Sequence, residues 1–374
     1  MDFYLGGMPI SQRIGFDARL IGALGIGRYI SGLLPPLGQI LADRLVVIGH
    51  ARDAALIRAL VGPRPAFTAA NAAPYRLAEQ ITMLARLASM RLALAHFPHY
   101  NLPLAYPGRF AVTIHDLFSF EFPEIHSGPV PRWINRALVS GAVSRATAVI
   151  APSHATASAV GKRFPRAAAR ITVIPEAADS RFTRTPPDDT WQRYYGVRMP
   201  YFLYLGQWKA YKNVPLLIDA FRQVVARRPE CQLVIVGQDA RHPEVPAAAA
   251  RLPSGSVVFP GRVPDAAVPP LYRQASAVVV PSLAEGFGLP VLEAMASGVP
   301  VVCSDIPVLH EVANGVAIFC DASDASAFAR GMLDALAMDD PRRDLGIARA
   351  HTFSWQAAAE KTVAVYERAL ATSR

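Results

Sequence analysis

The chain alternates short apolar segments with longer segments of helical character, and it does so through two successive halves. The apolar segments lack the alternating polarity of half-exposed strands, which is typical of parallel strands covered on both faces. In the first half we predict strands over Arg13–Phe16, Leu45–Ile48, Leu94–His96, Ala111–Ile114, Ala148–Ala151 and Ile171–Ile174. In the second half we predict them over Tyr201–Gly206, Gln232–Gly237, Val257–Pro260, Ala277–Pro281, Pro300–Cys303 and Ala317–Cys320.

Helices are predicted between and after these strands, over Arg28–Ala42, Ala137–Ser144, Leu216–Arg227, Val268–Arg273, Leu289–Ser297 and Ser354–Leu370. This alternation indicates an α/β fold with parallel sheets and right-handed crossovers. The segment Glu176–Thr190 is polar, contains proline and lacks periodicity, so we interpret it as a linker. We therefore predict one domain over residues 1–178, a second over residues 191–353, and a terminal helix in residues 354–374.

Composition excludes several classes of protein. Hydrophobic residues make up 52% of the chain and charged residues 18%, which excludes a disordered chain. No apolar run is long enough to span a membrane, and the N-terminus lacks the basic and apolar regions of a signal peptide. The cysteines, Cys231, Cys303 and Cys320, lack CxxC or metal-binding spacing and fit free thiols in a reducing cytosol. We expect a cytoplasmic protein.

The net charge of +9 comes from the first half of the chain. Such an excess favours an anionic partner, whether nucleic acid, an acidic membrane face or a phosphorylated small molecule, although a GC-rich coding bias explains many of the arginines equally well. Zinc-ligand spacing and aromatic–basic repeats are missing from the sequence, which argues against a nucleic-acid-binding module. The stretch Tyr75–Leu94 places arginines among leucines, which fits either a helix at an anionic membrane or a buried helix with snorkelling arginines.

Ligands in open parallel sheets bind at the carboxyl ends of the strands, so the loops after the predicted strands hold the candidate site residues. Gly25 and Gly27 precede a helix predicted to begin at Arg28, where backbone N–H groups can approach a phosphate. A tight turn that requires glycine is the alternative. His115 and Asp116 follow a buried strand, and a histidine there can bind a substrate hydroxyl or move a proton. A histidine that only caps the strand is the alternative.

The loop after Tyr201–Gly206 carries Lys209 and Lys212, two of the four lysines in an arginine-rich chain. Two ammonium groups beside a helix N-terminus suit a pyrophosphate whose negative charge grows as it leaves. Solvated surface lysines are the alternative explanation.

The loop after Ala277–Pro281 is the most specific, because Glu285 and Glu293 flank a glycine-rich, otherwise apolar stretch. Gly286 and Gly288 let backbone amides face a ligand, and Pro290 fits the first turn of a helix. Carboxylates accept strong hydrogen bonds from sugar hydroxyls. A loop acid and an ordinary helix-terminal charge are the alternatives for Glu285 and Glu293.

The stretch EGFGLPVLEAMASGVPVV resembles the E-x7-E motif of retaining glycosyltransferases of family 4 (GT4). LYLGQWKAYKN resembles the phosphate loop of that family, and FPGRVPDAAVPPLYRQASAVVVPS resembles its base-binding segment. HFPHYNLPL followed by TIHDLF resembles the subgroup with many bacterial mannosyltransferases of surface-polysaccharide assembly. The resemblance covers nearly the full length. It implies the GT-B fold, which has two facing Rossmann-like domains and a terminal helix that crosses back to the first.

The resemblance implies that Glu285 contacts the donor sugar near the reacting carbon, that Glu293 holds the nucleotide ribose, and that Lys212 and Lys209 bind the phosphates. It makes His115 and Glu285 the catalytic residues. The implied donor site consists of Gly25, Gly27, Gly206, Lys209, Lys212, Val263, Gly286, Phe287, Gly288, Leu289 and Glu293. Many members have arginine directly after the glycine of the phosphate loop, but this chain has Gln207.

The implied reaction retains the anomeric configuration by a front-face route and needs no metal or other cofactor, since lysines neutralise the leaving diphosphate. The implied donor is a nucleotide sugar, with GDP-mannose first and a UDP-sugar (glucose or N-acetylhexosamine) as the alternative. The implied acceptor is a glycan or a polyprenyl-diphosphate-linked saccharide, reached by peripheral contact with the inner face of the plasma membrane. An epimerase or phosphorylase on the same fold is a further alternative.

Overall fold

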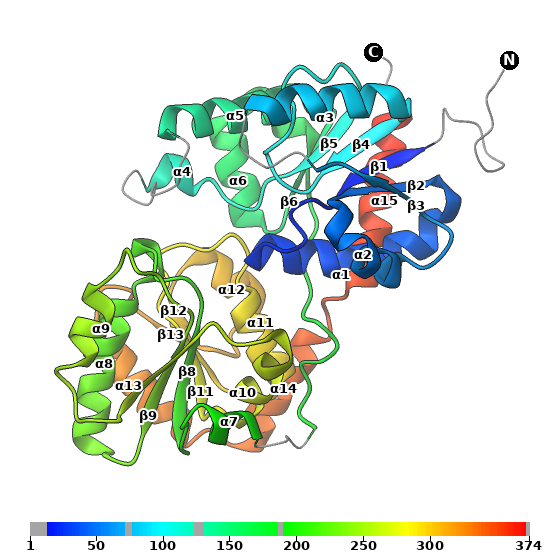
Figure 1. Ribbon diagram of the computed structural model, residues 1–374. Coiled ribbons are helices and arrows are strands. Elements are labelled where there is room, and N and C mark those ends of the chain that lie inside the picture. The colour runs from blue at the N-terminus through cyan, green and yellow to red at the C-terminus, as the bar shows by residue number, and fades with distance from the viewer. Residues whose placement is uncertain (1–12, 72–76, 123–130, 186–189, 372–374) are drawn as a thin grey trace, which may run out of the picture. The chain divides into compact units, whose positions relative to one another are not determined.

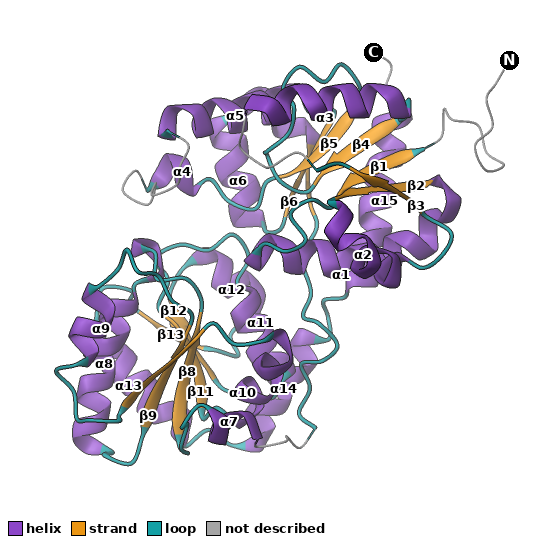
Figure 2. Ribbon diagram, in the orientation of Figure 1, coloured by secondary structure: helices purple, strands orange, loops and turns teal. Residues whose placement is uncertain are grey.

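The computed structural model describes residues 13–71, 77–122, 131–185 and 190–371. The chain divides into two compact units, one formed by Met1–Glu176 with Ser354–Arg374 and the other by Ala177–Phe353. Each unit is built on one parallel sheet with helices on both faces, as Figures 1 and 2 show. The predicted α/β class with two parallel-sheet, Rossmann-like domains is confirmed.

In the first unit the sheet order is β3-β2-β1-β4-β5-β6-β7. Its strands are β1 (Ile14–Asp17), β2 (Leu45–Gly49), β3 (Ala66–Ala69), β4 (Leu94–Phe97), β5 (Phe110–Thr113), β6 (Ala148–Ala151) and β7 (Ile171–Val173). Its helices are α1 (Leu24–Leu41), α2 (Ala54–Val61), α3 (Leu77–Met90), α4 (Phe118–Glu121), α5 (Arg132–Arg145), α6 (His154–Arg163) and α15 (Trp355–Ala371). All neighbouring strands run parallel, and their order reverses between β1 and β4.

Both faces of this sheet are covered, which explains why its strands show no alternating polarity. Apolar side chains of α1, α2 and α15 pack on one face, and those of α3, α5 and α6 pack on the other. The last helix, α15, is tied to the sheet by its Tyr366, whose hydroxyl lies 2.6 Å from Nδ1 of the buried His96. Nε2 of His96 in turn lies 2.8 Å from Oγ1 of Thr113.

In the second unit the sheet order is β10-β9-β8-β11-β12-β13. Its strands are β8 (Tyr201–Leu205), β9 (Gln232–Val236), β10 (Val257–Gly261), β11 (Ala277–Val280), β12 (Val301–Ser304) and β13 (Ile318–Cys320). Its helices are α7 (Thr190–Tyr194), α8 (Val214–Arg227), α9 (Glu244–Ala249), α10 (Val268–Gln274), α11 (Leu289–Ala296), α12 (Pro307–Ala313), α13 (Ala325–Leu336) and α14 (Asp340–Ala350). Helices α8, α9 and α13 share one core with the sheet, because their apolar residues recur every three or four positions.

The structure adds elements that the sequence patterns did not predict. Edge strand β3 and helices α2, α6, α13 and α14 are the main additions. Within the basic stretch Tyr75–Leu94 the structure describes α3 over Leu77–Met90, and Leu94 begins β4, while Tyr75 and Arg76 lie outside the described residues. Met83 and Leu87 of α3 are buried in the core while Ile81 is 67% exposed, so one face of this helix is covered and another is open.

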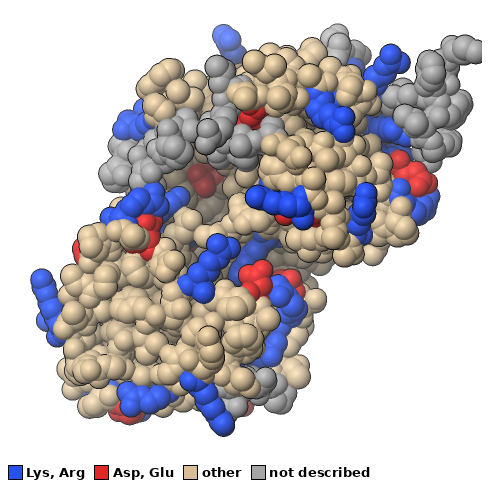
Figure 3. Space-filling model, viewed as in Figure 1, with Lys and Arg blue, Asp and Glu red and all other residues tan. Residues whose placement is uncertain are grey.

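Charged side chains are distributed rather than concentrated on the face of the molecule that Figure 3 shows. On the face drawn in Figure 3, Lys and Arg lie singly or in small groups, with Asp and Glu among them. In the part of the chain that the structure describes, none of the helices combines the length and apolar character that crossing a bilayer requires.

Candidate active site

The loop between β8 and α8 forms a single tight turn around its two lysines. The backbone N–H of Lys212 donates to the carbonyl of Lys209 (2.8 Å), and Ala210–Lys212 form a 3-10 turn. Asn213 then adopts a left-handed conformation (φ 55°) and donates from Nδ2 to the carbonyl of Ala322 at 2.8 Å. Lys209 and Lys212 therefore lie at the two ends of one turn, directly before the N-terminus of α8.

The loop between β11 and α11 meets that turn. The backbone N–H of Leu283 donates to the carbonyl of Tyr211 at 2.7 Å. The loop ends at Gly288, which has φ +102° and sits where a Cβ atom would lie 2.7 Å from Cδ2 of Leu309. The backbone conformation favours glycine there, and a larger residue would also require the side chain of Leu309 to shift. The next residue, Leu289, begins α11, with Pro290 in its first turn.

The two loops also share an ion pair. Nζ of Lys212 lies 2.6 Å from Oε1 of Glu285, and Oγ of the buried Ser282 donates to the same oxygen at 2.7 Å. The side chain of Glu285 is 8% exposed and that of Lys212 is 17% exposed. An ion pair this shielded from water is screened by salt far less than a surface pair. The structure thus brings together Lys212 and Glu285, two residues predicted from separate loops.

The remaining residues predicted in this loop take different positions. Glu293 lies on α11 in the helix turn after Pro290 and is 2% exposed. Phe287 is 6% exposed, because its ring packs edge-to-face against Phe353 with the ring centres 5.8 Å apart. Gly286 and Leu289 are partly exposed on either side of it.

Predicted backbone positions lie at the carboxyl edge of the same sheet. The backbone N–H of Gly206, just after β8, donates to Val236 at the end of β9 (3.1 Å). The N–H of Gly237 donates to Gly261 at the end of β10 (2.8 Å), and Val263, two residues further on, is 8% exposed. Strands β8, β9, β10 and β11 therefore deliver their loops to one edge, where ligands of such sheets bind.

In the first unit, His115 follows β5 and is held at both ring nitrogens. Its Nδ1–H donates to Oε1 of Glu176 and its Nε2–H donates to the carbonyl of Pro98, each at 3.0 Å. An acceptor at each ring nitrogen favours the doubly protonated imidazolium. Burial alone lowers the pKa of His115, but the hydrogen bond and charge of Glu176, with help from Pro98 and Asp116, outweigh burial and raise it. The geometry favours a fixed cation over a base that exchanges protons.

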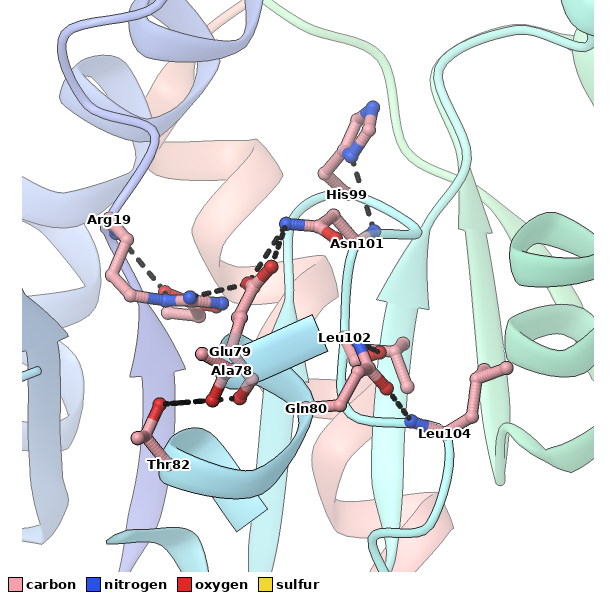
Figure 4. A network of polar contacts seen from close by, with 10 residues as sticks. Arg19, Ala78, Glu79, Gln80, Thr82, His99, Asn101, Leu102 and Leu104 are labelled. Carbon is pink, nitrogen blue, oxygen red and sulfur yellow. Dashed lines mark hydrogen bonds and ion pairs between the residues drawn. The ribbon is translucent and has the colours of Figure 1, made fainter. Parts of the chain in front are cut away.

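A second polar cluster lies at the ends of β1 and β4 in the first unit (Figure 4). Arg19 donates to Asp17 (2.7 Å) and to Glu79 of α3 (2.5 Å), and Asn101 donates its amide to Glu79 at 2.9 Å. Figure 4 shows the ring of His99 beside Asn101. The backbone N–H of Asn101 donates to Nδ1 of His99 at 3.2 Å. Burial, with a smaller effect from the charge of His115, lowers the pKa of His99 to about 3, so this ring is neutral.

Comparison with known proteins assigns the family. A model described as Glycosyltransferase Family 4 matches residues 25–182, and one described as Glycosyl transferases group 1 matches residues 196–351. The chain belongs to the family 4 glycosyltransferases. The enzyme is 29% identical to O-antigen chain mannosyltransferase B of Escherichia coli over 282 residues, which are 73% of each chain.

Solved structures show the GT-B fold of this glycosyltransferase. Sucrose-phosphate synthase from Thermosynechococcus elongatus superposes with a TM-score of 0.76 at 20% identity, over 97% of this chain and 100% of that one. HepE of Anabaena, solved with UDP and glucose, gives a TM-score of 0.75 at 19% identity, over 96% of this chain and 100% of that one.

The structure corrects the prediction for the first glycine loop of the glycosyltransferase. Helix α1 begins at Leu24 rather than Arg28, so Gly25 and Gly27 lie within its first turn and not in a loop before it. At Gly27 a Cβ atom would lie 2.3 Å from the carbonyl oxygen of Ile21, while at Gly25 it would meet no atom within 4 Å. Close packing within the unit therefore explains why residue 27 is glycine, but it does not explain the glycine at residue 25.

Sequence reasoning missed Glu176, Ser282 and the cluster around Arg19. Glu176 was interpreted as the first residue of a polar linker, but it is 4% exposed and bonded to His115. The rule that selected His115 also selects Glu176, because both closely follow a strand of the same parallel sheet. Ser282 follows β11 in the same way, whereas the pairing of Arg19 with Glu79 spans 60 residues and leaves no local signal.

Proposed function

We propose that this glycosyltransferase moves a hexose, with GDP-mannose as the first candidate donor, to a glycan or lipid-linked saccharide during bacterial cell-surface polysaccharide assembly. The observation that carries the proposal is the meeting of the Lys209–Lys212 turn with Glu285 at the carboxyl edge of the second sheet. Ammonium groups beside a helix N-terminus and a carboxylate beside them match the two ends of a nucleotide sugar. The mannosyltransferase relative supports mannose as the sugar.

In the proposed reaction the bond between the anomeric carbon and the diphosphate breaks, and a bond to the acceptor oxygen forms on the same face of the sugar. The acceptor proton passes to a phosphate oxygen of the leaving diphosphate. Lys209, Lys212 and the N-terminal amides of α8 stabilise the charge that grows there. Glu293 holds the ribose, Val263 and Gly206 border the nucleotide, and the imidazolium of His115 supplies a fixed charge to the sugar.

Two lysines at the phosphates support a reaction that does not depend on a divalent cation. A direct test is transfer by enzyme treated with a chelator, with and without added Mg²⁺ or Mn²⁺. Equal rates support the proposal, whereas loss of transfer on chelation and its return with metal would contradict it.

The donor is tested by thermal unfolding with GDP, UDP, ADP and their sugars. A ligand present at about 100 times its dissociation constant stabilises the fold by about 2.7 kcal/mol. We expect GDP and GDP-mannose to stabilise, while stabilisation by UDP and UDP-glucose alone would favour the UDP-sugar alternative. Conversion of the nucleotide sugar without an acceptor, or a requirement for inorganic phosphate, would instead favour an epimerase or a phosphorylase.

The roles of individual residues are tested by substitution. Lys212→Ala and Glu293→Ala should each lower the transfer rate by about two orders of magnitude, because one preorganised charge is commonly worth about 3 kcal/mol in the transition state. The exposed Arg222→Ala on α8 is the matched control and should leave the rate unchanged. Transfer at the wild-type rate by both Lys212→Ala and Glu293→Ala would contradict the proposed donor site.

A further inference from the structure

The carboxylate of Glu285 is paired with the ammonium group of Lys212, which the proposed function assigns to the diphosphate. Oε1 of Glu285 accepts from Nζ of Lys212 at 2.6 Å and from Oγ of Ser282 at 2.7 Å. The pairing crosses 73 residues of sequence and joins the loops after β8 and β11. The ion pair therefore depends on the tertiary structure at this edge of the sheet and is not a contact between neighbours in the chain.

A diphosphate bound to Lys212 would therefore lie beside a second negative group. An ammonium has three N–H donors, so Lys212 can bind phosphate while it stays near Glu285. The carboxylate and the phosphate then repel each other, and the repulsion is only weakly screened by water because the side chain of Glu285 is 8% exposed. Binding of the diphosphate must either move the carboxylate away from Lys212 or tolerate that repulsion.

An intact nucleotide sugar can offset this cost, and a bare nucleoside diphosphate cannot. Sugar hydroxyls donate hydrogen bonds that a carboxylate accepts strongly. A nucleoside diphosphate presents only further negative oxygens at the same place. We infer that Glu285 makes the site discriminate between donor and product, because it competes with the diphosphate for Lys212 unless a sugar engages it.

This inference rests on the proposed function and adds a consequence for turnover. The product of transfer is the diphosphate without its sugar, so the return of Glu285 to Lys212 favours product release. Ser282 is a positioning residue, since its hydroxyl holds the carboxylate at the lysine.

The test is calorimetric binding of GDP and GDP-mannose, and of UDP and UDP-glucose, to the wild type and to Glu285→Gln. In the pair that the wild type binds, Glu285→Gln should bind the bare diphosphate about tenfold more tightly and the nucleotide sugar about tenfold more weakly. Glu230→Gln is the matched control, because Glu230 pairs with Arg228 before β9 at the opposite edge of the sheet. It removes the same charge and should change neither affinity.

Unchanged or weaker binding of the bare diphosphate by Glu285→Gln would overturn the inference and leave the proposed function standing. A wild type that binds none of the four nucleotides would overturn both. Glu285→Ala provides a second measurement, since it also removes the carboxylate and should tighten diphosphate binding in the same direction if Glu285→Gln fails to fold.

Discussion

At the residue scale, one local motif occurs in buried and in exposed settings. In an Asp-x-Arg fork, one carboxylate accepts both from the arginine backbone N–H and from its Nε, as at Asp17–Arg19, Asp179–Arg181 and Asp239–Arg241. The side chains of Asp17 and Arg19 are 7% and 2% exposed, whereas those of Asp179 and Arg181 are 45% and 53% exposed. The same hydrogen bonds should therefore contribute very differently to stability.

Arg19→Met should lower the free energy of unfolding by about 3–5 kcal/mol, because it leaves Asp17 and Glu79 buried without their cation. Arg181→Met breaks the matching exposed fork and should cost less than about 1 kcal/mol. Urea unfolding followed by circular dichroism measures both. Similar small losses in the two variants would show that burial does not control the strength of this motif.

The ion pair of His115 gives a second prediction at this scale. Glu176→Gln removes the charge that raises the pKa of His115, so burial dominates and the pKa falls below its usual value. Imidazole NMR titration measures this shift, and Asp179→Asn, an exposed carboxyl nearby in sequence, should leave it unchanged. The raised pKa stabilises the fold fully below about pH 6.5 and this stabilisation is lost as pH rises through the folded pKa. A pKa of His115 that is unaffected by Glu176→Gln would contradict the pairing.

At the element scale, the sequence predicted most strands of the two sheets, because buried parallel strands are short, apolar and regularly spaced. It misplaced elements whose ends depend on packing. Glycines lower helix propensity, so Gly25 and Gly27 suggested a loop, yet α1 includes both because its remaining turns are fixed against α15 and the sheet. Glu176 was assigned to a linker for a similar reason, since polarity alone does not reveal a buried partner 61 residues away.

The start of α1 predicts opposite effects for two neighbouring glycines. Gly25→Ala should stabilise the fold by about 0.5–1 kcal/mol, because alanine is favoured in helices and the added methyl group enters open space. Gly27→Ala should destabilise it, because the methyl group would press on the carbonyl of Ile21. Thermal unfolding of the two variants without ligand compares them. Destabilisation by Gly25→Ala would indicate that residue 25 is not helical.

At the scale of the whole molecule, each sheet carries a group of polar residues at its carboxyl edge. The loops after β8 and β11 supply two lysines and a carboxylate, while the ends of β1, β4, β5 and β7 supply His115, bonded to Glu176, and a buried charge cluster. Motif spacing within two short loops could predict Lys209, Lys212 and Glu285, but not the ion pair of Lys212 with Glu285, which spans 73 positions. In the second set the pairings of Arg19 with Glu79 and of His115 with Glu176 span 60 and 61 positions, and only the folded sheet brings these residues together.

The net charge of +9 leads to a prediction about membranes. Helices α3 and α5 cover the same face of the first sheet and expose Ile81 (67%) and Trp133 (71%). Arg132 lies next to Trp133 in α5, and α3 carries the exposed Arg86. We expect the enzyme to sediment with phosphatidylglycerol vesicles but not with phosphatidylcholine vesicles.

Raising salt from about 0.1 M to about 1 M shortens the Debye length from about 10 Å to about 3 Å and should release the enzyme from the vesicles. Trp133→Ser should weaken binding, whereas Tyr194→Ser, an equally exposed aromatic of the second unit, should not. If vesicle binding changes neither with salt concentration nor with Trp133→Ser, this face is not the membrane contact.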